Sequence, residues 1–337
     1  MSYNVCDLIQ IPRSRQEREK AKAVGSIIHR ENPDILALQE CGPLEVLQHI
    51  NDKYFNRAYN QVVYSEIQGR HRLAILIKPG IDVEAVISHV GHRLPKGQPV
   101  PAGLRTTGFE RDFLQANLLI PASRDNQAYT LTMFNTHFKA GVDGGGKRLH
   151  EAQCASDVIT QELSGKHNPA GVKKRILVVG DLNVTPTNPA GRRVLNTLAG
   201  LEDKRPDNDL VNLVARSKPG EIPRSHVCGG QRDHSFANDA LAKDVLNAKI
   251  VGDFSRTWPW RVASDHLPVL TDIFIPSPVE ANAMVLPKPL GIHFPAEFRN
   301  RSLGKPVNHS ANNNPINTHR HARLQGPARI AKLVAMA

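Results

Sequence analysis

Acidic and imidazole side chains recur directly after apolar runs of this sequence. Glu40 follows the run 35–38, Asp181 follows the run 176–179, and His137 comes shortly after another apolar run. Runs of this length and composition are typical of strands that are buried on both faces. Because functional groups gather in the loops at strand ends, we expect these side chains to line one cleft.

The pair Asp265-His266 differs from the others because it precedes an apolar run, 267–275, instead of following one. The pair joins the same cleft only if this final strand runs antiparallel to its neighbours. A lone aspartate beside a strand is more often a turn or cap residue. The hypothesis of a single site therefore depends on several such groups converging.

Together these groups suit the hydrolysis of a phosphate ester. Glu40 and Asp265 offer carboxylates and Asn4 offers an amide oxygen, which hard cations such as Mg²⁺ or Mn²⁺ prefer as ligands. A bound cation offsets the negative charge that builds on the phosphoryl oxygens. A histidine is suited to deprotonate the attacking water because its pKa lies near neutrality. We therefore expect His266 to be the general base, with Asp233 fixing its tautomer.

The remaining candidates would position the water and the phosphate. Asp181 and Asn183 are expected to orient both, and His137 to stabilise or protonate the developing charge. Three basic side chains are candidates for phosphate contacts: Arg111, Lys139 and Arg148. A salt bridge or a solvated surface is an equally good interpretation of these three residues.

The elements that must position these groups are mixed along the chain. Ser14 and Glu17 form the pattern of a capping box, which predicts a helix over 14–31 that ends before Pro33. A second amphipathic helix is predicted over 147–163. Strands are expected at 2–6, 35–38, 73–77, 83–88, 113–120, 129–135, 176–179, 233–237 and 267–275. Because strands outnumber helices and several follow one another after short links, two packed sheets with helices outside are favoured.

The charge of the chain is concentrated near its end. The 337 residues carry a formal net charge of +11, which favours anionic partners such as nucleic acid or phosphorylated small molecules. Residues 276–337 contain eight Lys or Arg and two acids, a net of +6, which leaves +5 for residues 1–275. We expect a catalytic domain over 1–275 and a disordered basic tail over 276–337, which also holds eight prolines and seven asparagines. The mild charge of the domain weakens the case for a DNA-reading surface on it.

The cysteines and the hydropathy pattern bear on the compartment. The four cysteines form no C-x-x-C pair, and we interpret them as ordinary thiols of a reducing compartment. No apolar run of 18 residues predicts a transmembrane helix, and no basic region followed by an apolar run predicts a signal peptide. These features predict a cytoplasmic protein.

Five segments resemble, in the same order, the motifs of the endonuclease/exonuclease/phosphatase superfamily, which includes pancreatic-type deoxyribonuclease. They are Tyr3-Asn4-Val5, residues 33–40, Asn135-Thr136-His137, Gly180-Asp181-Leu182-Asn183 and Ser264-Asp265-His266-Leu267-Pro268-Val269. The resemblance implies a four-layer α/β/β/α sandwich in which Glu40 binds metal. It also implies that Asp181 and Asn183 orient the nucleophile and phosphate, and that His266, paired with Asp233, is the base or a phosphate contact.

Two positions depart from particular branches of the superfamily. Abasic-site endonucleases have an aspartate two residues after the first-motif asparagine, where this chain has Cys6. The pancreatic-type branch has a glutamate in the place of His71, supporting the histidine that corresponds to His137. These departures leave the superfamily intact and the branch open.

The sequence therefore predicts a Mg²⁺- or Mn²⁺-dependent hydrolase of phosphate esters. A phosphodiesterase with nuclease activity is preferred because of the basic tail and the two histidines. Two alternatives stay open: a lipid or small-molecule phosphoesterase, similar to sphingomyelinases or inositol phosphatases, and a catalytically inactive binding protein on the same scaffold.

Overall fold

The computed structural model describes residues 1–65, 69–95, 108–121, 128–164, 174–203, 205–254 and 257–275, together with the backbone of Gly291 and Ile292. The predicted tail over 276–337 therefore lies outside the described residues, apart from that two-residue segment. Within the described part, no helix is both long and apolar enough to span a membrane.

The strands of the described residues form two sheets. The first sheet has the order β11 (Val245–Ile250), β12 (Val269–Ile273), β1 (Ser2–Leu8), β2 (Ile35–Cys41), β4 (Arg72–Ile77), β3 (Gln61–Tyr64) and β13 (Gly291–Ile292). The second has the order β5 (Asp82–Ser88), β6 (Phe113–Ile120), β7 (Tyr129–His137), β8 (Ile176–Asp181), β10 (Asp233–Asn238) and β9 (Leu210–Asn212).

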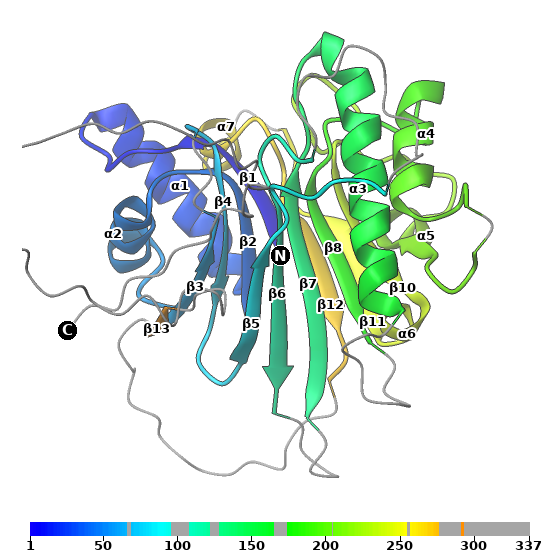
Figure 1. The fold of residues 1–337 in the computed structure, drawn as a ribbon. Helices are drawn as coiled ribbons and strands as arrows, with labels where there is room; N and C mark the ends of the chain where they lie inside the picture. The colour runs from blue at the N-terminus through cyan, green and yellow to red at the C-terminus, as the bar shows by residue number, and fades with distance from the viewer. Residues whose placement is uncertain are drawn as a thin grey trace, which may run out of the picture.

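Helices cover the outer face of each sheet (Figure 1). The first sheet is covered by α1 (Arg15–Glu31) and α2 (Leu44–Tyr54), and the second by α3 (Gly145–Leu163) and α4 (Pro189–Leu198). Shorter helical segments lie in the connections: η1 (Val142–Gly144), α5 (Leu213–Ser217), α6 (Asp239–Ala242) and α7 (Trp260–Ala263). The predicted four-layer α/β/β/α sandwich is confirmed.

Three apolar clusters hold the four layers together. One lies between the sheets and includes Ile75, Leu118 and Leu177; the other two lie under the outer helices. Burial on both faces explains why the central strands read as continuous apolar runs. The capping box of α1 forms as predicted, since the Ser14 hydroxyl accepts from the Glu17 N–H and the Glu17 carboxylate accepts from the Ser14 N–H.

Strand directions bring the predicted site groups to one end of the sandwich. In the first sheet β1 runs parallel to β2, and β12 runs antiparallel to β1 with Val269 opposite Ser2. The pair that precedes β12 therefore lies at the end where β2 finishes, as the sequence required. In the second sheet β10 runs antiparallel to β8, so that Asp233 is opposite Asp181. We call this end, where β2 and β8 finish, the mouth of the sandwich.

Two helices of the outer layers have no counterpart in the sequence-based expectations. The α2 helix has no side-chain cap and only three turns, which makes its pattern hard to separate from a loop. The α4 helix did carry a signal: the Asn188 side chain caps the Gly191 N–H and Pro189 occupies the first turn. The final strand is shorter than predicted, Val269–Ile273, because Leu267 and Pro268 belong to the loop that enters it.

Asn135 on β7 joins the two sheets in the interior. Its amide nitrogen donates to the carbonyl oxygens of Leu38 and Ala74, each at 3.0 Å, and its amide oxygen accepts from Gln39 Nε2 at 2.7 Å. The side chain is fully buried. Buried polar groups of this kind stabilise a fold only while all of them are paired.

Replacing Asn135 with Ala is expected to lower the free energy of unfolding by about 3 kcal/mol, since two carbonyls and the Gln39 amide lose a buried partner. Urea denaturation followed by circular dichroism measures this. Thr130→Ala, on a partly exposed position of the same strand, is the matched control. Equal stability of the two variants would contradict the proposed link between the sheets.

Candidate active site

Local backbone distortions place Glu40 at the mouth. The pairing of β2 with β4 shifts register between Gln39 and Cys41, and Glu40 has a φ of 57°. On the facing strand, Cys6 and Asp7 have φ values of 46° and 60° within the irregular part of the β1–β2 pairing. Left-handed non-glycine residues are uncommon and cost free energy, and bulges commonly re-aim side chains beside functional sites. These bulges turn the carboxylate of Glu40 out of the ladder.

Close strand packing fixes Asp181. The preceding residue, Gly180, has a φ of 147°, and a Cβ atom there would lie 1.9 Å from the carbonyl oxygen of Thr136. Only glycine lets β8 approach β7 so closely at this point. As a result Asp181 is paired with His137 in the parallel register of the two strands.

Five of the predicted residues meet in what we call the central cluster: Asn4, Glu40, His137, Asp181 and His266. The amide nitrogen of Asn4 donates to Asp181 Oδ2 at 3.1 Å and to Glu40 Oε1 at 3.3 Å. Asp181 Oδ2 is 3.4 Å from His137 Nε2 and 3.6 Å from His266 Nε2. The convergence of Glu40, Asp181 and His266 that the sequence required is therefore observed.

His266 is held by a buried carboxylate. Its Nδ1 is 2.8 Å from Asp233 Oδ2, which also accepts from the Ser225 hydroxyl at 2.7 Å. Burial acts to lower the pKa of His266, but the carboxylates of Asp233 and Asp181 outweigh it and raise the pKa to about 10. Burial, together with the nearby Asp233, raises the pKa of Asp181 to about 7. The arrangement favours a charged imidazolium for His266 at neutral pH.

His137 has no hydrogen-bond partner for either ring nitrogen among the described residues, although its side chain is only 1% exposed. Its Nε2 faces Asp181 and lies 3.8 Å from Glu40 Oε1. Burial lowers the pKa of His137 well below its usual value, so the ring is neutral. An unpaired buried imidazole is costly, and one that lies beside two carboxylates is suited to contact a ligand or substrate.

Asn183 follows Asp181 in a left-handed conformation with a φ of 53°. Its backbone N–H donates to Asp181 Oδ1 at 2.8 Å, and its amide nitrogen donates to the carbonyl oxygen of Phe138 at 3.1 Å. The turn thus fixes the orientation of the Asp181 carboxylate.

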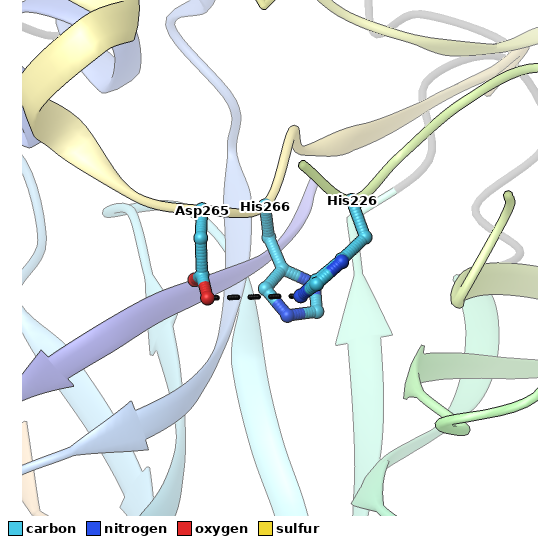
Figure 2. A group of neighbouring side chains, drawn as sticks. All are labelled: His226, Asp265 and His266. Atoms are coloured by element: carbon cyan, nitrogen blue, oxygen red, sulfur yellow. Dashed lines mark ion pairs between the residues drawn. The ribbon is translucent and has the colours of Figure 1, made fainter. Parts of the chain in front are cut away.

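Asp265 belongs to a different group of possible ligands from Glu40, with which it was expected to share a cation. Its side chain is 43% exposed, and His226 lies beside it, with 3.6 Å between His226 Nε2 and Asp265 Oδ2. Figure 2 shows Asp265, His266 and His226 directed toward one another from neighbouring loops. The three residues each offer a ligand atom within 4.8 Å of the others.

His226 is a site residue that the sequence did not reveal. It lies in a loop with no apolar run beside it, and it reaches the mouth through an isolated β-bridge to His266. The two rings are perpendicular, with centroids 4.6 Å apart. Burial and the neighbouring His266 lower the pKa of His226 to about 4.

Asp7 and His71 extend the site on the side of Glu40. The backbone N–H of Asp7 donates to Glu40 Oε2 at 3.2 Å, and His71 Nε2 lies 2.5 Å from Asp7 Oδ1 and 4.0 Å from Glu40 Oε2. These three residues also offer ligand atoms within 4.8 Å of one another. Two carboxylates and an imidazole are a donor set for a divalent cation such as Mn²⁺, provided that the cation displaces the Nε2 proton that His71 shares with Asp7 Oδ1.

The orientation of the Asn4 amide bears on its expected ligand role. Its amide oxygen accepts from the backbone N–H of Cys6 at 2.9 Å, while its amide nitrogen faces the carboxylates. A flipped amide would place two donors against each other, so this orientation is fixed by the bulge. In this orientation Asn4 positions Glu40 and Asp181, and its role as a metal ligand stays a prediction.

The three basic candidates for phosphate contacts are all engaged with the protein. Lys139 forms an ion pair with Glu110 at 2.8 Å, and the guanidinium of Arg148 donates to the carbonyl oxygens of Lys139 and Gly141. Arg111 donates to the carbonyl oxygen of Phe138 at 2.9 Å. For Lys139 the salt-bridge interpretation is the one observed, while contacts of these residues with a substrate stay a prediction.

The fold and the groups at its mouth are those of the class that the motifs resemble, the phosphoesterases with a two-sheet sandwich. The sequence model of the Endonuclease/Exonuclease/phosphatase family matches residues 1–266. The chain therefore belongs to this family. A comparison with curated protein sequences gave no match.

Solved structures of the same fold cover most of the chain at low identity. Truncated TDP2 from Caenorhabditis elegans matches with a TM-score of 0.52 and 17% identity, covering 80% of this chain and 94% of that one. The human nocturnin catalytic domain with bound sulfate matches with a TM-score of 0.54 and 13% identity, covering 81% and 92%. The mannosyl-6-phosphatase Bt3783 from Bacteroides thetaiotaomicron matches with a TM-score of 0.53 and 14% identity, covering 81% and 98%. At these identities the likeness shows the fold alone.

Proposed function

We propose that this protein is a divalent-cation-dependent phosphodiesterase that acts on nucleic acid. The single observation that carries the proposal is the meeting of three groups: the Asn4 amide donates to both Glu40 and Asp181, and His266 Nε2 lies 3.6 Å from Asp181 Oδ2. A carboxylate for a cation, a carboxylate for a water and an imidazolium for a phosphate are the three groups that the hydrolysis of a phosphodiester requires.

The cation is assigned to Glu40, Asp7 and His71. We prefer this set to the Asn4 and Asp265 of the sequence-based expectation. The Asn4 oxygen accepts a hydrogen bond from the Cys6 N–H, and the Asp265 carboxylate lies beside His226. A cation bound there would neutralise charge on the phosphoryl oxygens. The imidazole of His71 makes Mn²⁺ the expected preference over Mg²⁺, which favours oxygen ligands alone.

The chain's own residues account for the water and the phosphate. Asp181, oriented by Asn4 and by the N–H of Asn183, holds the attacking water and accepts its proton. His266, kept charged by Asp233, contacts a phosphoryl oxygen. The sequence left His266 open as base or phosphate contact, and its pairing with Asp233 favours the contact. His137, neutral and without a hydrogen-bond partner among the described residues, donates to the same phosphoryl group.

A cavity beside Asp265 supports a substrate with an aromatic or apolar portion. The cavity has a volume of about 480 Å³ and is lined by Lys20, Val227, Phe254 and Trp260, among others. Aromatic side chains beside a phosphate site suit the base of a nucleotide, because every base offers a face for stacking. Arg30 lies over the Trp260 ring and Arg224 over the Phe254 ring, so a base would have to use the other face of each ring. Residues 1–275 carry only a mild positive charge, which supports binding of an anionic polymer less strongly than a dedicated DNA-reading surface would. A small sugar phosphate is the second candidate substrate, because one of the structural relatives is a mannosyl-6-phosphatase.

The test is turnover of bis-p-nitrophenyl phosphate with Mn²⁺, with Mg²⁺ and after EDTA. We expect Mn²⁺ to support faster hydrolysis than Mg²⁺, and EDTA to abolish hydrolysis until cation is restored. Turnover that is unaffected by EDTA would contradict the assigned cation site. A panel of plasmid DNA, abasic oligonucleotide, RNA, sphingomyelin and mannose 6-phosphate then separates the substrate classes, and a steep fall of binding with salt identifies nucleic acid.

If the protein were an inactive binding protein on the same scaffold, the same assay would give a different result. Such a protein would bind inorganic phosphate or oligonucleotide but hydrolyse none of the panel with any cation. The complete central cluster argues against this alternative, because Asn4, Glu40, Asp181 and His266 keep contacts with one another.

A further inference from the structure

The proton of the His226 ring is placed by a backbone contact. The N–H of Cys228 donates to His226 Nδ1 at 2.9 Å, so Nδ1 must present its lone pair. A ring that accepts at Nδ1 carries its single proton at Nε2. The hydrogen bond therefore defines His226 as a neutral imidazole with a donor at Nε2.

That donor has no acceptor within hydrogen-bond distance among the described residues. The nearest recorded partner is Asp265 Oδ2, at 3.6 Å, which is too long for a hydrogen bond. The His226 side chain is 7% exposed, and its Nε2 is not among the fully buried polar atoms that lack a partner. Nε2 is directed toward Asp265 and lies beside the ring of His266 at the mouth (Figure 2). Nε2 therefore presents a donor at the mouth that lies near a carboxylate but is hydrogen-bonded to none of the described residues.

A metal ion does not fit this cluster, although the spacing of His226, Asp265 and His266 resembles a ligand set. A metal needs the lone pair of Nε2, and His226 carries a proton there. His266 uses its Nδ1 for Asp233. A donor and an imidazolium side by side instead suit an anion.

We propose that His226 Nε2–H donates a hydrogen bond to a non-bridging oxygen of the substrate phosphoryl group, next to the contact made by His266. This proposal rests on the proposed function and adds a phosphate-binding residue to it. His226 does not transfer a proton, because the loss of its only ring proton would leave an imidazolate. It stabilises the charge of the phosphoryl group by donation alone, as a neutral donor aimed at a developing oxyanion does.

The test compares His226→Ala and His226→Gln with the wild type and with His29→Ala, which removes an exposed histidine of α1 and is the matched control. We expect kcat/KM for bis-p-nitrophenyl phosphate to fall about 10²-fold in His226→Ala, the loss typical of one oxyanion donor. Glutamine restores part of the loss because its amide donates from a similar position. The fall should be equal for diphenyl phosphate, whose leaving group is poorer, since a non-bridging contact is insensitive to the leaving group. A larger fall for diphenyl phosphate would overturn the assignment to a non-bridging oxygen.

Two further measurements are independent of turnover. Long-range ¹H–¹⁵N spectra of the imidazole rings should show the His226 proton on Nε2, and inorganic phosphate in Mg²⁺ buffer should shift this signal. Calorimetry should show weaker binding of inorganic phosphate by His226→Ala than by the wild type or His29→Ala. A proton on Nδ1, or equal phosphate binding by all proteins, would refute the proposal. Phosphate binding that depends on His226 without any hydrolysis would support it while defeating the proposed enzyme activity.

Discussion

Asp181→Asn is expected to reduce kcat for bis-p-nitrophenyl phosphate by about 10³-fold or more, within the range that removal of a general base produces. Asparagine keeps the shape of the side chain and still accepts the Asn183 N–H at one oxygen. It has no second oxygen to accept the proton of the water, and it presents an NH₂ group to Asn4 or to His266. The loss is therefore chemical and should appear in kcat under saturating substrate and cation.

The control for this variant is Asp52→Asn, which changes a carboxylate of α2 that is 51% exposed and paired with Arg57. Thermal unfolding should be cooperative for both proteins. If Asp181→Asn retains more than about a tenth of the wild-type kcat, Asp181 is not the proton acceptor, since a general base contributes at least 10²-fold.

Replacing His266 with Ala is expected to lower kcat/KM by about 10³-fold, because the phosphoryl group loses an imidazolium and the buried Asp233 loses its charged partner. Steady-state kinetics with Mn²⁺ measure this. A buried carboxylate without its partner is also costly for folding, so the alanine variant is expected to unfold at a lower temperature.

A second variant separates catalysis from folding. His266→Gln removes the positive charge but keeps a side-chain donor in the space beside Asp233, so it should fold closer to wild type and still lose most of its activity. His49→Ala, a partly exposed histidine of α2, is the matched control. Near-normal kcat/KM for His266→Gln would show that the charge of His266 is unimportant and would contradict the phosphate contact.

The sequence by itself determined the scaffold and the centre of the site. Continuous apolar runs followed by Glu40 and Asp181 predicted strands that are buried on both faces and end at a functional edge. Because Asp265-His266 precedes its strand, the pair could join the site only if that strand ran antiparallel to its neighbour, and β12 does so. These inferences succeeded because periodicity, burial and the order of motifs are properties of short segments of chain.

Only the tertiary structure decided which neighbours those groups have. Asp7 and His71 are 64 residues apart and meet because bulges in β1 and β2 turn the chain outward at the mouth. His226 reaches His266 through one bridge between two loops. The orientation of the Asn4 amide depends on the N–H of Cys6. Cys6 has a left-handed backbone conformation that no local sequence pattern predicts. Contacts of this kind follow from strand register and bulges between distant segments. A short sequence pattern cannot predict them, because it contains only one of the segments that make the contact.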